Sequence, residues 1–85
     1  MELLAIFANS QAALHAEQLL KAAGMVPELI PVPRQIHSDC GFCLLLGEAE
    51  GRAEALRAGG ARELWRVSPA DPSSARKVKR YERIP

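Results

Sequence analysis

The chain has 85 residues, of which 48% are hydrophobic, and its formal net charge is +1. This length allows one small domain and excludes two independent cores. The near-neutral charge gives no strong field that would steer nucleic acid or an anionic membrane to the protein. Residues 1–68 carry six Lys or Arg against eight Asp or Glu, whereas residues 69–85 carry five against two. We therefore expect a single domain over 1–68 and a basic C-terminal tail over 69–85.

The first residues give no sign of export or membrane insertion. The segment MELLAIFANS lacks the basic region and the cleavage site of a secretory signal. Its apolar run ends at Ala8, far short of the roughly 20 residues that span a bilayer. The two cysteines are only three positions apart, so they cannot staple long loops as secreted proteins do. We expect a cytoplasmic protein, not bound to a membrane, whose cysteines begin as thiols.

The first predicted elements are a strand, a helix and a second strand. Residues 3–8 form a continuous apolar run, which Asn9 closes as a favoured helix cap. Apolar residues then recur at helical spacing over 10–23, and Gly24 ends this helix. A short strand at 29–32 follows, and the prolines around it are typical of an edge strand.

The second half repeats the order of strand, helix and strand. Residues 42–46 are a second apolar strand, residues 48–58 a shorter helix that two glycines end, and residues 62–67 a last strand. The order β-α-β-β-α-β predicts an α+β fold of the ferredoxin-like βαββαβ kind, a two-layer sandwich with the basic tail outside its core. Both helices would cover one face of a four-stranded antiparallel sheet and leave the other face open. We expect a homo-oligomer, formed through that open face or through an edge strand.

Candidate chemistry lies in the segment IPVPRQIHSDCGFC, residues 30–43, which ends on Cys40 and Cys43. Arg34 precedes Cys40 by six residues and His37 precedes it by three, so a turn could bring either cation near this thiol. A nearby cation lowers the pKa of a thiol and so increases the reactive thiolate. Cys40 is the predicted reactive thiol, and it could accept sulfur as a persulfide.

The residues that flank Cys40 favour a loop, whereas Cys43 favours a core position. Ser38 would shape the loop, and Gly41 would let the backbone approach a substrate. We place Cys40 at or just before the start of the strand, and Cys43 inside the strand as a small hydrophobe. If residues 40–43 are extended, the two cysteine Cα atoms lie roughly 10 Å apart, beyond the ~7 Å limit for a disulfide. A dithiol oxidoreductase is therefore not expected.

The order of elements and two short motifs resemble a known family. An opening strand, a helix containing AEQLLKAAG and the string LIPVPRQIHSDCG are similar to the selenium/sulfur carrier-like family of small bacterial proteins. The resemblance covers residues 3–67, and its most specific part is PR at 33–34 followed by SDCG at 38–41. It implies a compact α/β fold and a role for Cys40 in carrying or transferring sulfur or selenium. Cys43 and the tail lie outside the pattern.

The leading hypothesis is a cytoplasmic carrier or transfer protein in which Cys40 accepts sulfur or selenium. Arg34 and His37 would tune the thiol, and Ser38 and Gly41 would support its loop. The implied partner is a sulfur donor protein such as a cysteine desulfurase. The chain shows no complete set of acid, base and nucleophile, so we do not expect a stand-alone enzyme, and we expect no cofactor.

Two alternatives stay open. The first is an interaction or regulatory module without thiol chemistry, acting through the open sheet face or the basic tail. The second, ranked lower, is a metal site shared by His37, Cys40 and Cys43, which Asp39, water or a second subunit would have to complete, because structural zinc needs four ligands. The basic tail has no accompanying RNA-binding signature, so we expect no nucleic acid partner.

Overall fold

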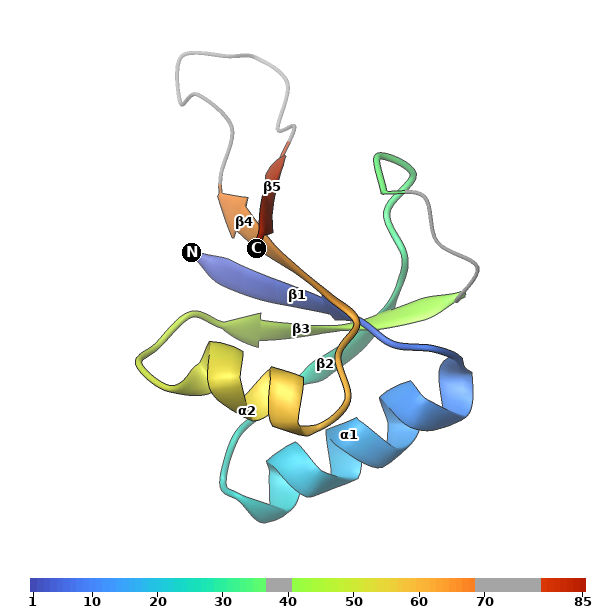
Figure 1. The fold of residues 1–85 in the computed structure, drawn as a ribbon, viewed down its shortest axis with the longest axis vertical. Coiled ribbons are helices and arrows are strands. Elements are labelled where there is room, and N and C mark those ends of the chain that lie inside the picture. The colour runs from blue at the N-terminus through green and yellow to red at the C-terminus, as the bar shows by residue number, and fades with distance from the viewer. Residues whose placement is uncertain (37–40, 69–78) are drawn as a thin grey trace.

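The computed structural model describes residues 1–36, 41–68 and 79–85 of the chain (Figure 1). The fold is α+β, with two helices and a five-stranded antiparallel sheet. The elements, in chain order, are β1 (Glu2–Ile6), α1 (Ser10–Ala22), β2 (Glu28–Pro31), β3 (Phe42–Gly47), α2 (Arg52–Ala58), β4 (Glu63–Ser68) and β5 (Arg80–Ile84). The strands lie in the order β2-β3-β1-β4-β5. Figure 1 shows both helices on the same side of this sheet.

Helix α1 begins and ends at the residues that the sequence indicates. The Asn9 side chain accepts a hydrogen bond from the Ala12 backbone N–H at 2.8 Å, which caps the first turn. At the other end Gly24 has φ +86°, a left-handed conformation that glycine adopts without strain. The Met25 N–H then bonds to the Leu20 carbonyl at 3.0 Å, as in a Schellman cap. Local signals therefore set both ends of this helix.

Helix α2 is shorter than the sequence predicts, because it begins at Arg52 and not near residue 48. Gly51 has φ +80°, outside the helical region, so the helix cannot extend through it toward the N-terminus. The Arg52 guanidinium donates a hydrogen bond to the Gly47 carbonyl at 2.6 Å and so ties the first turn to the end of β3. Leu56 is fully buried and anchors the helix on the sheet.

One face of the sheet packs against the helices. Leu3, Ala5 and Phe7 project from β1 and the residue after it, and they contact buried residues of both helices. The other buried members of this cluster are Ala13, Ala16 and Leu20 of α1, Leu44 and Leu46 of β3, Leu56 of α2 and Leu64 of β4. The alternation along β1 follows from strand geometry, in which successive side chains point to opposite faces.

The second face of the sheet is buried as well, which corrects the prediction of an open face. Its cluster contains Leu4, Ile6, Ile36, Cys43, Leu45 and Val67, all at most 8% exposed. Half-buried Ile30, Val32, Trp65 and Tyr81 pack around this cluster. Because β1 and β3 carry apolar side chains toward both faces, an open second face would have left a large apolar surface in water. The predictions of an interaction module and of self-association through this face stay untested predictions.

The predicted four-stranded ferredoxin-like sheet also needs correction, because the observed sheet has five strands, in the order β2-β3-β1-β4-β5, with β5 added beside β4. The additional strand is β5, whose residues Arg80–Ile84 were expected to lie in an irregular basic tail. It pairs with β4 in an antiparallel register in which Val67 stands opposite Tyr81 and Leu64 opposite Ile84. Tyr81 packs on the second-face cluster and Ile84 on the helix-face cluster, so β5 contributes to the packing on both faces. No helix among the described residues is long and apolar enough to cross a membrane.

Candidate functional site

Three of the five predicted site residues, His37, Ser38 and Cys40, lie outside the described residues. Arg34 and Gly41, on either side of them, are described, and so is Cys43. The structure therefore defines the frame that holds the predicted thiol loop.

The two ends of this loop are held together by the sheet. Strands β2 and β3 pair up to Pro31 opposite Phe42, and the Val32 N–H then bonds to the Gly41 carbonyl at 3.2 Å. Residues 33–40 therefore leave and re-enter the sheet at one end of this strand pair. The predicted end of the second strand, before Pro33, and the predicted start of the third at Phe42 are both confirmed.

A tight turn begins the loop. The Ile36 N–H donates a hydrogen bond to the Pro33 carbonyl at 3.0 Å, so Arg34 occupies a position inside this turn. Arg34 is exposed, whereas Ile36 is buried, 5% exposed, in the second-face cluster. The apolar anchor fixes the turn on the sheet and leaves the guanidinium of Arg34 in water at the same end of the sheet as Gly41.

Gly41 is the first described residue after the predicted thiol loop. A Cβ added at this position would meet no atom of the described residues within 4 Å. Because residues 37–40 lie outside the described residues, the expectation that Gly41 lets the backbone approach a substrate stays a prediction.

Cys43 lies inside β3, as predicted. Its side chain is 0% exposed on the second face, in register with Ile6 of β1 and Ile30 of β2. The Cys43 Sγ lies 3.9 Å from the Pro31 carbonyl oxygen, to which the thiol donates a weak hydrogen bond. A thiol in such apolar surroundings is shielded from reagents and substrates. Cys43 is therefore a core residue.

The proposed metal site finds little support from the one ligand that is described. Cys43 sits among apolar side chains, where a metal ion would have to be desolvated. Among residues 1–36, 41–68 and 79–85, no group of three or more His, Cys, Asp or Glu is placed to hold a metal ion. His37 and Cys40, the other two candidate ligands, lie outside these ranges.

The best-formed ion pair lies at the other end of β3. Arg66 Nε and Nη2 donate to the Glu48 Oε2 at 3.0 and 2.9 Å. These hydrogen bonds lower the pKa of Glu48 below its ordinary value, and they raise the pKa of Arg66. Glu48 follows the last residue of β3, whereas the predicted thiol loop precedes the first, so this pair serves the fold and does not tune the thiol.

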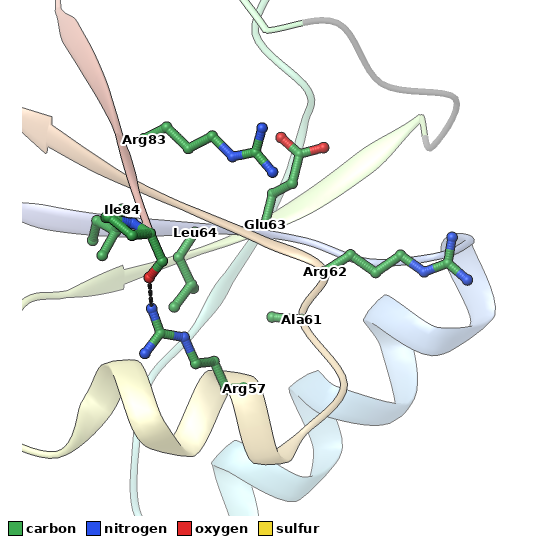
Figure 2. Close-up of a pocket in the computed structure, with 8 residues that line it drawn as sticks. Arg57, Ala61, Arg62, Glu63, Leu64, Arg83 and Ile84 are labelled. Atoms are coloured by element: carbon green, nitrogen blue, oxygen red, sulfur yellow. Dashed lines mark hydrogen bonds between the residues drawn. The ribbon is translucent and has the colours of Figure 1, made fainter.

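Sequence reasoning missed a polar pocket of about 220 Å³ beside the end of β5. Figure 2 shows Arg83 of β5 and Glu63 of β4 extending toward one another, while Arg57 of α2 donates a hydrogen bond to the Pro85 carbonyl oxygen. Arg62 also lines the pocket, but its side chain extends away toward α1. In RYERI the two large apolar residues, Tyr81 and Ile84, are three positions apart and do not alternate with polar residues, so there was little signal for a strand here.

Comparison with known proteins identifies one family. A family model described as "Putative Se/S carrier protein-like" matches residues 2–59, which is more than half of the chain and includes the whole predicted thiol loop. No curated protein and no solved structure matches the chain.

Proposed function

The chain belongs to the Se/S carrier protein-like family, and on this premise we propose that it carries sulfur or selenium on Cys40 in the cytoplasm. The observation that carries the proposal is the complete burial of Cys43, 0% exposed. The chain has two cysteines, so a carrier that uses a thiol of the folded protein has Cys40 as its candidate. Cys40 also belongs to the SDCG string that lies within the matched residues.

The proposed step is a sulfur transfer between thiols. The Cys40 thiolate attacks the outer sulfur of a persulfide on a donor protein such as a cysteine desulfurase. The S–S bond of the donor breaks, a new S–S bond forms on Cys40, and the donor leaves as a thiolate. One persulfide is consumed and one is formed, so the step needs no added oxidant or reductant. The same exchange with a selenium-bearing donor would load selenium.

The frame around the loop supports this chemistry. Arg34 is an exposed cation in a turn that Ile36 anchors, at the end of the sheet where Gly41 rejoins β3. A guanidinium near a thiol favours the thiolate and so lowers the thiol pKa. His37 is the second candidate cation. We therefore expect Cys40 to react with iodoacetamide at pH values below the ordinary thiol pKa of about 8.5.

The test is intact-mass measurement after incubation with a cysteine desulfurase and cysteine. We expect an increase of about 32 Da, one sulfur atom, that Cys40→Ser abolishes and Cys43→Ala retains. Circular dichroism of both variants controls for folding. No adduct from any sulfur or selenium donor, with the wild-type protein folded, would overturn the proposal.

A second experiment tests the supporting cation. Arg34→Gln should shift the pH profile of Cys40 alkylation to higher pH, and Arg34→Lys should restore part of the shift because it keeps the charge. Arg57→Gln is the matched control, since Arg57 is also exposed but lies on α2, and it should leave the profile unchanged. A profile that is identical in all variants would remove Arg34 from the site.

A further inference from the structure

The two edges of the sheet are protected in different ways. Edge strand β2 ends on Pro31, and Pro27 and Pro33 lie close on either side. Proline has no N–H to offer to a further strand, so this edge is poorly suited to pairing. Strand β5 (Arg80–Ile84) contains no proline, and among the described strands only β4 pairs with it. With respect to residues 1–36, 41–68 and 79–85, its outer edge therefore presents backbone groups that a sixth strand could use.

Two positive charges on β5 have no opposite charge across the β4 ladder. Arg80 and Arg83 each stand opposite an uncharged residue of β4, whereas Glu82 stands opposite Arg66. Both arginines are exposed. Lys79, next to β5, already pairs with Glu2 at 3.9 Å. The charge of this edge is therefore net positive. Arg80 has no acidic residue opposite it on β4, whereas Arg83 extends toward Glu63 of β4.

The pocket at the end of β5 increases this positive character. Its lining includes three arginines, Arg57, Arg62 and Arg83, and a single carboxylate, Glu63. The Glu63 Oε1 also accepts a hydrogen bond from the Trp65 indole N–H at 3.2 Å. Figure 2 shows that Arg83 and Glu63 extend toward one another and that Arg62 extends toward α1, so Arg83 is the arginine that β5 itself contributes to this pocket.

A second copy of the chain meets like charges in most registers at this edge. In an antiparallel two-fold pair of β5 strands, the register is set by the residue that faces itself across the axis. Centring the pair on Arg80, Glu82 or Arg83 places that charge against its own copy. Centring it on Tyr81 places Lys79 against Arg83 but also Arg80 against Glu82, and centring it on Ile84 pairs only the last three residues. Like charges directly opposite one another destabilise a strand pair, so the charge pattern disfavours the registers centred on a charged residue.

We propose that the β5 edge accepts an extended acidic segment of a partner protein as a sixth, antiparallel strand. Acidic residues of the segment would stand opposite Arg83 and Arg80, three positions apart. An uncharged residue would stand opposite Glu82, and a β-branched or aromatic residue opposite Tyr81. Backbone hydrogen bonds would provide the affinity and the two charge pairs would provide the selectivity. The proposal goes beyond sulfur carriage and does not depend on a thiol.

The test measures binding of a capped peptide, Thr-Val-Glu-Thr-Val-Glu-Thr, to the full chain. The control peptide has both Glu replaced by Lys, and we expect its binding to be weaker by roughly tenfold or more. The Cys40→Ser variant, which cannot carry sulfur on residue 40, should bind the acidic peptide as tightly as the wild type does. Peptide binding and sulfur loading can therefore fail independently of one another. Equal binding of the two peptides would overturn the charge argument.

Charge-swapped variants locate the contact. The double change Arg80→Glu and Arg83→Glu should reverse the preference, so that the Lys peptide binds more tightly than the Glu peptide. Arg62→Glu is the control, because Arg62 lines the same pocket but points away from β5. It should keep the original preference. If the double variant unfolds, the corresponding Gln changes should still remove the preference. A preference that survives both double variants refutes the site.

Strand addition has its own signature. Methylation of the peptide backbone nitrogens at one set of alternate positions should abolish binding, and methylation at the other set should preserve it, because successive N–H groups of a strand point to opposite sides. Hydrogen exchange should slow at alternate amides of Lys79–Ile84 when the acidic peptide binds. Binding that tolerates both methylation patterns, without slower exchange in β5, would show ionic contact without strand pairing and overturn the proposal.

Discussion

The burial of Cys43 makes a quantitative prediction about thiol reactivity. Its side chain is 0% exposed within β3, so iodoacetamide reaches the Sγ only when the sheet opens. At 0.05–0.15 kcal/mol per residue, a chain of this length has an unfolding free energy of about 4–13 kcal/mol. Even the lower value populates the open state at about one part in 10³. Native Cys43 should therefore be alkylated at least about 10³-fold more slowly than an accessible thiol.

The assay compares two single-cysteine proteins. Cys40→Ser isolates Cys43, and its alkylation in buffer should be at least about 10³-fold slower than in urea that unfolds it. Cys43→Ala isolates Cys40, whose rates in the two solvents should agree within about tenfold. The Cys43→Ala change should cost about 1 kcal/mol, small enough to keep the protein folded. If Cys43 in the native Cys40→Ser protein reacts within tenfold of its rate in the unfolded protein, Cys43 is accessible and the reasoning is refuted. Burial of Cys43 could then no longer be used to assign the carrier thiol to Cys40.

Three further predictions concern the frame of the fold. Leu56→Ala should lower the unfolding free energy by about 2–5 kcal/mol, because Leu56 is the fully buried residue of α2 that packs on the helix-face cluster. A loss below about 1 kcal/mol in urea unfolding would show that α2 packs loosely. Gly51→Ala should lower the unfolding free energy by about 1–2 kcal/mol, because the φ of Gly51 is +80°. Gly41→Ala should change the unfolding free energy by no more than about 0.5 kcal/mol, because an added Cβ meets no described atom within 4 Å. Equal losses in the two variants would contradict the conformation assigned to Gly51. Because folding lowers the pKa of Glu48, its pair with Arg66 stabilises the fold at pH values above the pKa that Glu48 has in the unfolded chain. This stabilisation is lost as the pH falls through the lower pKa that Glu48 has in the folded protein. A carboxyl NMR titration should show the Glu48 pKa rising toward its ordinary value in Arg66→Gln, and an unchanged pKa would exclude Arg66 as the cause.

Strong local signals made part of the fold predictable. Apolar spacing, Asn9 and Gly24 set α1 at 10–22, within one residue of the prediction. Helix α2 was predicted too long because a single glycine in a helical pattern indicates only a weak helix former, whereas the left-handed φ of Gly51 prevents the helix from beginning before Arg52. A propensity of about 1 kcal/mol does not reveal a conformation that the turn before the helix imposes.

Features that depend on distant pairing were harder to predict. Strand β5 has three charged residues among five, and its strand conformation comes from pairing with β4 and from half-burial of Tyr81 and Ile84. The buried second face had a signal in the sequence. LLAIF and FCLLL are continuous apolar runs and do not alternate with polar residues, a pattern typical of strands covered on both faces.

In the candidate site, too, the features set by local sequence were predicted correctly, whereas the features set by the path of the loop could not be predicted. The apolar run FCLLL correctly placed Cys43 inside a strand, and Pro33 correctly marked the end of the strand before the loop. The role of Gly41 was predicted from residue type alone, and it stays a prediction because the loop before it lies outside the described residues. The relation of Cys40 to Arg34 and His37 depends on the loop path, which spacing in the sequence does not determine.

The central position of β1 has a consequence for synthesis of the protein. β1 is the first strand to be made, yet both of its neighbours, β3 and β4, come later in the chain. Glu63, the first residue of β4, follows Ile6 by 57 positions, which take roughly 3–11 s to translate at about 5–20 residues per second.

During that interval the apolar segment Leu3–Phe7 lacks the β4 partner that it has in the finished sheet. Exposed apolar strands in incomplete chains are prone to aggregate and to bind chaperones. Slower elongation should therefore lower the yield of folded protein.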